Sequence, residues 1–348
     1  MTPKTRTTAA WLLSAAALVL SAGAAQAQGE VNIYSYREPQ LIDPLLKAFT
    51  QKTGIKTNVV YASAGLNERL AAEGANSPAD LLFTVDAGRL SEAKAAGLTQ
   101  AVDDKLISST VPAQFRDPDG HWVGITMRAR IVYASKERVK QDTITYEELA
   151  DPKWKGKICI RSGQHVYNTS LFATMIANKG EAFTEQWLKG VKANLAHKPA
   201  GGDREQARDI ASGKCDLALG NTYYMALMAQ NEKNPEQKTW AAAIKPIFPN
   251  VQDRGTHINI SGMALTKHAP NKANAIQLME FLASDEAQKI YAIANNEYPV
   301  NQKVEPSAIV KSWGTLKPDP LPLENIGKLR KKASELVDKV NFDAGPSS

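Results

Sequence analysis

The sequence predicts an α/β protein of two lobes, each a mostly parallel sheet flanked by helices, with two strands crossing between the lobes. Three observations carry this prediction. Short β-branched runs alternate with amphipathic segments early in the chain, the same alternation returns in its middle, and a long β-rich stretch follows each of these regions. The 348 residues are also enough for two hydrophobic cores. Proteins built in this way bind ligands in the cleft between the lobes.

The first region alternates strands and helices. These elements are expected, in chain order, at residues 31–35, 44–53, 55–61, 67–73, 79–84 and 90–96. The first of the helices has apolar residues on one face and ends before Gly54, which is typical of a helix C-terminus. The β-rich stretch at 122–135 follows and would be the first crossing strand.

The middle region repeats the pattern. Its expected elements are a strand at 158–160, helices at 170–178, 182–190 and 204–212, and a strand at 216–219. A second β-rich stretch at 257–266 precedes one strong helix at 271–294, and the residues from 342 onward are expected to be frayed. The lobes would be 28–127 with 256–299, and 128–255 with 300–348.

Composition limits the partners. The chain is 43% hydrophobic and 22% charged, with 42 basic and 36 acidic residues and a net charge of +6. This excess is small and no basic stripe is clustered, so we expect no nucleic-acid partner. Two cysteines exclude a framework of several disulfides and a four-cysteine zinc site.

The N-terminus predicts export. Lys4 and Arg6 precede an apolar run at 9–20, and the small residues Ala25 and Ala27 form a cleavage site after Ala27. Residues 1–27 are therefore expected to be a signal peptide, and no later apolar run is long enough to cross a membrane. Disulfides form in extracytoplasmic compartments.

The two cysteines lie in apolar segments that are typical of short buried strands. If the strands of Cys159 and Cys215 are neighbours, the two sulfurs come within bridging range, and we favour a disulfide. Two buried free thiols, or a metal held by the pair, are the alternatives.

Five stretches of the chain carry a resemblance to a known family. They are IYSYRE at 33–38, SPADL at 77–81, WVGITMRARI at 122–131, GNTYY at 220–224 and HINISG at 257–262. Through them the chain resembles the ferric-iron-binding group of periplasmic solute-binding proteins of ABC importers. The resemblance implies a periplasmic-binding-protein fold, capture of Fe³⁺ in the cleft, and delivery to a permease at the inner membrane. We expect a monomer located in the periplasm.

Tyrosines are the predicted ligands of the iron. Phenolate is a hard oxygen ligand that suits Fe³⁺, and a bound metal ion can remove the phenol proton. Tyr223 and Tyr224 follow Asn221 and Thr222, which are good helix caps, so both side chains could reach one ion from a first helical turn. Chemistry alone favours the alternative that the two aromatics pack a helix start, and the family resemblance favours iron binding instead. Tyr167, in a polar loop, matches the family's third tyrosine.

The first lobe departs from the family pattern. Many relatives have a histidine, or histidine and tyrosine, where this chain has Glu38 and Pro39. Glu38 is the predicted ligand there because carboxylate suits a hard ion, and Tyr36 is a second candidate or a nearby supporting residue. Arg128 and Arg130 share one face of the first crossing strand and could hold a synergistic anion such as carbonate. Salt bridges between the lobes are the alternative for these arginines.

The alternative functions are binding of a small organic ligand and catalysis. A relative of the same fold could bind thiamine, a polyamine or a phosphonate, but none of these ligands requires adjacent tyrosines. No enzyme is expected, because the sequence contains no nucleophile elbow, no His-Glu-x-x-His, no Walker loop and no dinucleotide-binding glycine pattern.

Overall fold

The computed structural model describes residues 29–346, so the predicted signal peptide lies outside the described residues. Nine strands are described: β1 Glu30–Ser35, β2 Lys56–Tyr61, β3 Leu81–Thr84, β4 Val123–Ser135, β5 Ile158–Cys159, β6 Leu217–Asn221, β7 Ile244–Ile247, β8 Ile258–Leu265 and β9 Tyr298–Pro299. They run in the order β2-β1-β3-β8-β4-β6-β5, with β7 and β9 also paired to β4.

Helices cover both halves of this sheet. The α-helices are α1 Pro39–Thr53, α2 Leu66–Glu73, α3 Ala87–Ala95, α4 Lys105–Thr110, α5 Val166–Lys179, α6 Glu181–Ala193, α7 Asp203–Ala211, α8 Thr222–Ala229, α9 Glu236–Ala243, α10 Lys272–Ala283, α11 Asp285–Asn295, α12 Ala308–Lys311 and α13 Leu323–Lys339. Short 3₁₀ turns lie at η1 Gly74–Asn76, η2 Ala113–Phe115, η3 Glu147–Ala150, η4 Pro152–Trp154 and η5 Phe342–Ala344. Within residues 29–346, no helix combines the length and the apolarity that crossing a membrane requires.

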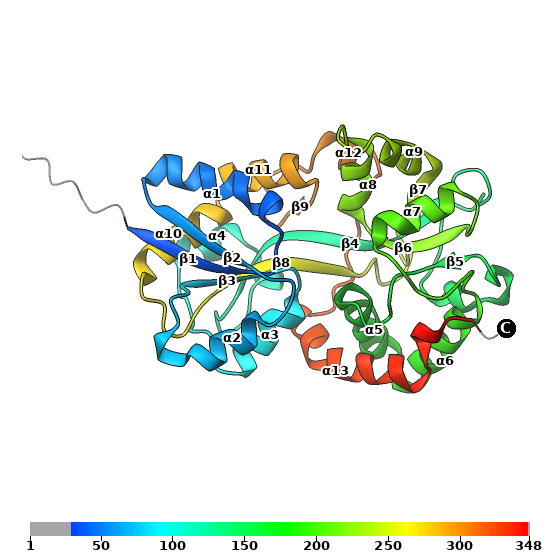
Figure 1. Ribbon diagram of the computed structural model, residues 1–348, viewed down its shortest axis with the longest axis horizontal. Helices are drawn as coiled ribbons and strands as arrows, with labels where there is room; N and C mark the ends of the chain where they lie inside the picture. Colours follow the sequence, from blue (N-terminus) through cyan, green and yellow to red (C-terminus); the bar gives the residue numbers. More distant parts are fainter. Residues whose placement is uncertain (1–28, 347–348) are drawn as a thin grey trace, which may run out of the picture.

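Two lobes are visible, with β4 and β8 running between them (Figure 1). Every residue of the 13-residue strand β4 is buried. Its first part pairs with β8 and β9, and its last part with β6 and β7. The predicted two-lobed α/β architecture with crossing strands is therefore confirmed. Helix α13 contacts both α3 in one lobe and α5 in the other.

Strand direction is more mixed than the sequence predicted. The pairs β1–β2, β1–β3 and β5–β6 are parallel, as expected for strands joined through helices. Every pair that includes β4 or β8 is antiparallel. Strand β4 runs antiparallel to β8 in the first lobe and to β6 and β7 in the second, so it introduces antiparallel pairing into each sheet.

Helix α1 shows how the sequence forms these elements. Its apolar positions recur on one face, and Ile42, Leu45, Leu46 and Phe49 are buried against the sheet. The helix begins earlier than predicted, at Pro39, because proline fits a first helical turn. It ends at Gly54, whose φ of 75° is the left-handed conformation that glycine adopts without strain.

Three further boundary predictions were wrong. The single helix expected at 271–294 is two helices, because the hydroxyl of Ser284 caps a new helix by accepting from the Ala287 amide at 3.3 Å. The helix expected to begin at Ser170 begins at Val166. The end of the chain is not frayed at Phe342, whose ring is fully buried and lies 5.9 Å from that of Phe172.

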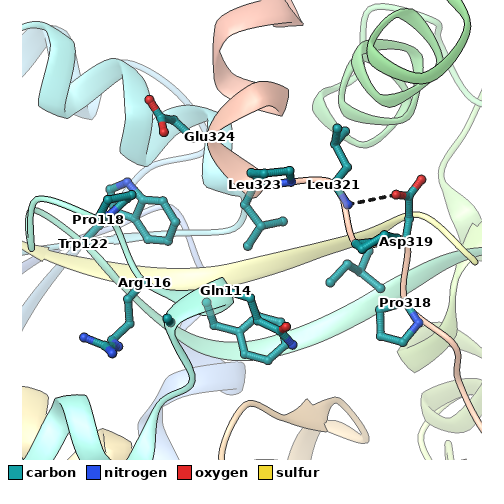
Figure 2. Close-up of a pocket in the computed structure, with 14 residues that line it drawn as sticks. Gln114, Arg116, Pro118, Trp122, Pro318, Asp319, Leu321, Leu323 and Glu324 are labelled. Carbon is teal, nitrogen blue, oxygen red and sulfur yellow. Dashed lines mark hydrogen bonds between the residues drawn. The ribbon is translucent and has the colours of Figure 1, made fainter. Parts of the chain in front are cut away.

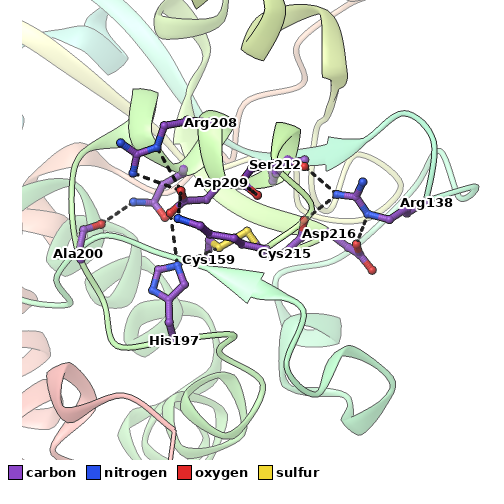
Figure 3. The surroundings of a disulfide bond; sticks show 12 residues. Arg138, Cys159, His197, Ala200, Arg208, Asp209, Ser212, Cys215 and Asp216 are labelled. Carbon is purple, nitrogen blue, oxygen red and sulfur yellow. Dashed lines mark hydrogen bonds and ion pairs between the residues drawn. A yellow bond between two sulfur atoms is a disulfide. The ribbon is translucent and has the colours of Figure 1, made fainter.

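The two cysteines form a disulfide. Strands β5 and β6 are parallel neighbours, with Cys159 opposite Ala218, and Cys215 lies two residues before β6. This register places the Cα atoms of Cys159 and Cys215 5.8 Å apart, within the usual range for a disulfide (Figure 3).

Candidate metal centre

Three tyrosines from two helix starts meet at one point. Tyr223 and Tyr224 lie in the first turn of α8, and their ring centroids are 4.3 Å apart. Tyr167 lies in the first turn of α5, not in a loop, and its phenol oxygen is 3.1 Å from that of Tyr223. The three predicted phenols are therefore neighbours in space.

Local packing fixes the start of α8. The Tyr133 hydroxyl donates to the carbonyl of Asn221 at 2.5 Å, where β6 ends. The Tyr133 ring lies over Gly220, and a Cβ at position 220 would be 2.1 Å from it. Only glycine therefore fits before Asn221. Because the chain turns into a helix here, the adjacent tyrosines do not point to opposite faces as they would on a strand.

His165 positions Tyr167 from the helix end. Its Nδ1 atom accepts from the Tyr167 amide at 3.2 Å, and the two rings meet edge to face with centroids 4.6 Å apart. Burial, with the nearby Arg161 charge, lowers the pKa of His165 to about 3, so the imidazole is neutral and its Nδ1 can accept.

The tyrosines line a cavity of about 770 Å³ to which both lobes contribute. From the first lobe come Tyr36, Glu38, Tyr61, Ser63, Val85 and Arg89, among others. From the second come Arg161, His165, Tyr167, Arg204, Tyr223, Tyr224 and the segment that includes Lys233. Two predicted residues, Tyr36 and Glu38, thus face the same space as the three phenols.

Burial keeps the phenols of Tyr223 and Tyr224 protonated when no cation is near. It raises the pKa of Tyr223 and of Tyr224 well above 10, and the neighbouring tyrosine charges raise the pKa of Tyr223 further. Phenolates so close together would repel one another. The cluster can lose its protons only if a cation takes their place.

A ring of guanidinium groups surrounds Tyr167. The guanidinium carbons of Arg128, Arg130 and Arg161 lie 5.6, 5.8 and 5.2 Å from its ring centroid. Arg204 lies 4.7 Å from the Tyr224 ring. These cations would stabilise negative charge on the phenol oxygens.

Asp203 holds two of these arginines. Its Oδ2 atom accepts from Arg130 at 2.7 Å and from the Asn221 amide at 2.8 Å, and its Oδ1 accepts from Arg161 at 3.1 Å. The carboxylate is fully buried. Burial alone would raise the pKa of Asp203, but the Arg130 and Arg161 charges hold it below its ordinary value.

Neither of the arginines predicted to bind an anion lines the large cavity. They do share one face of β4, as strand alternation predicts, and both face Tyr167. Arg130 forms its ion pair with Asp203 in the same lobe. Arg128 donates one Nη2 hydrogen bond to the carbonyl of Val85, and its buried Nη1 has no partner within residues 29–346.

The two candidate ligands in the first lobe, Tyr36 and Glu38, differ in the contacts that hold their side chains. The Tyr36 hydroxyl accepts from the Asn67 amide at 2.9 Å, and Arg89 lies 4.1 Å from its ring. Glu38 is the exposed residue before α1, and its carboxylate accepts only from the neighbouring Gln40 within residues 29–346. Glu38 is therefore the less constrained of the two within residues 29–346.

Sequence reasoning missed several residues that line the cavity: Tyr61, Arg89, Arg161 and Arg204. Tyr61 could have been found, because it ends β2 beside the end of β1, and the carboxyl ends of parallel strands commonly form binding sites. The arginines carry no comparable local signal.

A second cavity, of about 300 Å³, shares no lining residue with the first. It lies between η2, the start of β8 and the segment before α13, and apolar side chains and prolines such as Trp122, Leu323 and Pro318 surround it (Figure 2). No group of oxygen ligands converges there, so it does not suit a hard cation.

Comparison with known proteins defines the class. Residues 76–312 match the family described as bacterial extracellular solute-binding protein, and this chain belongs to that family. The resemblance drawn from the sequence is thereby confirmed.

Several relatives within this class are named for iron uptake or ferric binding. The chain is 42% identical over 317 residues to iron uptake protein A1 of Synechocystis sp., covering 90% of this chain and 88% of that protein. It shares 53% identity with the solved Bordetella ferric binding protein, with a TM-score of 0.84 over 90% of this chain and 99% of that one. A Trichodesmium protein solved with iron and citrate ligands shares 42% identity and a TM-score of 0.86, covering 90% and 100%.

Proposed function

We propose that this protein captures ferric iron between its lobes and delivers it to an ABC permease. One observation carries the proposal, namely that the phenol oxygens of Tyr167, Tyr223 and Tyr224 come from two helix starts to one cavity wall. The names of the similar proteins, which state iron uptake and ferric binding, support the same ligand.

The spacing of the phenols suits a small hard cation. Oxygens at neighbouring corners of an octahedron with metal–oxygen bonds of about 2.0–2.1 Å lie about 2.9 Å apart. The Tyr167 and Tyr223 oxygens, at 3.1 Å, are close to that separation without any metal bound. Fe³⁺ is hard and highly charged, so it is the cation best able to displace phenol protons.

Closure of the lobes would complete the ligand set. In this proposal the lobes are 28–127 with 256–299 and 128–255 with 300–348, and hinge motion brings the Glu38 carboxylate onto the ion. The remaining positions take a synergistic anion such as carbonate. Because Arg161 and Arg204 line the cavity, they hold this anion, whereas Arg128 and Arg130 stabilise the phenolate of Tyr167 from behind.

The description of the family as extracellular solute-binding proteins supports a location outside the cytoplasm. We infer a periplasmic location, reached through a signal peptide cleaved after Ala27, and a partner permease at the inner membrane. The protein would act as a monomer that carries its cargo and catalyses no reaction.

A visible absorption titration tests the proposal. Purified mature protein is titrated with a ferric chelate, and a phenolate-to-iron charge-transfer band should saturate at one equivalent. Absence of the band together with absence of retained iron would overturn the proposal. Thermal-shift screening of phosphonates, polyamines and thiamine would then test the organic-ligand alternative.

A further inference from the structure

A second group of metal-binding side chains surrounds the disulfide, at the far end of the strand order. The Nε2 atom of His197 lies 3.3 Å from the Cys159 sulfur and 3.4 Å from Oδ2 of Asp209. Figure 3 shows the His197 ring directed toward the disulfide and Asp209. These ligand atoms all lie within 4.8 Å of one another, and Cys215 supplies a second sulfur. None of the four residues lines the tyrosine cavity.

The hydrogen bonding of His197 leaves its Nε2 atom as the one that faces the cluster. Its Nδ1 atom lies 2.8 Å from the carbonyl of Lys198, and because a carbonyl only accepts, Nδ1 carries the proton. A histidine that binds a metal commonly donates its other ring N–H to a backbone carbonyl in this way. The Nε2 atom of His197 therefore faces a sulfur and a carboxylate oxygen, and in the neutral imidazole it carries the lone pair.

The charges around Asp209 also leave one of its oxygens available. Arg208 and Lys214 both lie 3.2 Å from its Oδ1 atom. Oδ2 is directed to His197. The two cations lie next to the cluster and would stabilise thiolates formed there.

The separations match a tetrahedral zinc site. With Zn–S bonds of about 2.3 Å and Zn–N or Zn–O bonds of about 2.0–2.1 Å, neighbouring ligands lie about 3.5 Å apart for sulfur and nitrogen, and about 3.3 Å for nitrogen and oxygen. The observed values are 3.3 Å between Cys159 and His197, and 3.4 Å between His197 and Asp209. The Cys215 sulfur is not part of this group of three, so it would have to turn toward His197 and Asp209 when the disulfide opens.

We propose that Cys159, Cys215, His197 and Asp209 form a four-ligand Zn²⁺ site when the disulfide is reduced by a dithiol. Two electrons and two protons pass from the dithiol to the two sulfurs, and the dithiol closes into its own disulfide. Zn²⁺ then displaces the two thiol protons and binds the thiolates with the imidazole and the carboxylate. The oxidised chain has no thiolates and lacks the site.

The cluster is accessible enough for such an exchange. The cysteines are buried, but a third of the His197 side chain is exposed, so the imidazole covers the disulfide at the surface. The site binds a soft-ligand cation away from the hard tyrosine cluster. Retention of zinc at the disulfide cluster would therefore report the redox state of the protein, and this zinc would not compete with iron for the tyrosines.

Cobalt and zinc binding by the full mature chain tests this proposal. The protein is reduced with dithiothreitol under argon, desalted and titrated with Co²⁺, then with Zn²⁺. One equivalent of Co²⁺ should give tetrahedral and thiolate charge-transfer bands that Zn²⁺ abolishes, with affinity at least about 100-fold above that of the oxidised protein. His197→Gln and Asp209→Asn should each weaken Zn²⁺ binding by about 10–100-fold. The matched control, His268→Gln, replaces an exposed histidine and should change nothing.

Several results would overturn the proposal. These are equal Zn²⁺ affinity in the reduced and oxidised chains, or unchanged affinity in both His197→Gln and Asp209→Asn. Circular dichroism and thermal unfolding of the same samples monitor the fold. Zn²⁺ should raise the melting temperature of the reduced wild-type chain and not that of reduced His197→Gln. A reduced chain that unfolds and is not refolded by Zn²⁺ would also count against the site.

Discussion

The phenol oxygens of Tyr167 and Tyr223 lie 3.1 Å apart although the residues are 56 positions apart in the sequence. Two hydroxyls at this distance share one hydrogen bond, and two phenolates there would repel strongly. The contact therefore prepares a site that is neutral when empty and becomes negative only around a cation. The affinity for iron should therefore depend on each phenol oxygen and on pH.

Removing one phenol oxygen should weaken iron binding without changing the fold. Tyr223→Phe keeps the buried ring and deletes one proposed ligand. We expect the ferric affinity to fall at least about 100-fold, which corresponds to about 2.7 kcal/mol, and the charge-transfer band to weaken and shift. Competition with a chelator of known affinity measures the first effect, and the absorption titration measures the second.

A buried tyrosine outside the cluster gives the matched control. The hydroxyl of Tyr298 is buried and has no hydrogen-bond partner among residues 29–346, so Tyr298→Phe deletes the same atom without removing a ligand. It should bind iron like the wild-type protein. Equal affinities for Tyr223→Phe, Tyr298→Phe and wild type would contradict the assignment.

Iron binding should release protons. Burial raises the pKa of Tyr223 and Tyr224 well above 10, so both phenols are neutral in the unloaded protein at neutral pH. Each phenol that binds iron as a phenolate therefore gives up one proton. The apparent affinity should therefore rise with pH throughout the range in which the protein is folded. A pH indicator in weakly buffered solution measures the number of protons released when iron is added. Tyr223→Phe should lower that number by one. A release that is the same in both proteins would exclude Tyr223 as a phenolate ligand.

Local patterns predicted most of the fold and only part of the candidate site. The crossing strands were predictable because β4 and β8 are long β-rich runs, and Tyr223 with Tyr224 stood out because they follow helix caps. Tyr167 was found through the family resemblance, but its place in a helix was not, because His165 is an uncommon cap.

The rest could not be predicted because it depends on contacts between distant parts of the chain. Asp203 pairs with Arg130, 73 positions away, and with Arg161, 42 positions away. From the sequence alone Asp203 looks like an ordinary helix cap, whereas in the structure Gly202 is the cap and Asp203 is a buried counter-ion. No local pattern marks which acidic residue will meet which arginine.

Asp203 should matter to stability far more than an exposed acid. Asp203→Asn leaves the buried Arg130 without its counter-ion, and breaking a buried ion pair in this way costs about 3–5 kcal/mol. The control is Asp142→Asn, which removes an exposed ion pair with Lys245 and should leave stability almost unchanged. Urea unfolding followed by circular dichroism measures both. Similar midpoints for the two variants would show that the Asp203 pairs add no stability.

Acid should destabilise the protein in part through His257. This imidazole is buried, and its Nδ1 lies 2.8 Å from the hydroxyl of Thr174. Burial, with the charges of Arg128, Arg130 and Arg254, lowers the pKa of His257 to about 3, against about 6.5 in the unfolded chain. Below pH 6.5 the unfolded chain therefore binds a proton that the folded protein does not. The free energy of unfolding should fall as the pH drops from about 6.5 toward 3, by up to about 1.4 kcal/mol per pH unit.

His257→Gln isolates this contribution, because the amide can still bond to Thr174 but does not titrate. Between about pH 7 and pH 4.5 the wild-type protein should lose about 2–3 kcal/mol more than this variant, since the carboxylates are common to both. His268→Gln, at an exposed position, should keep the wild-type slope. Urea midpoints at four pH values give the slopes. If stability falls with pH in parallel for wild type and His257→Gln, the buried imidazole takes up a proton as readily in the folded protein as in the unfolded chain. His257 would then not be a cause of acid sensitivity.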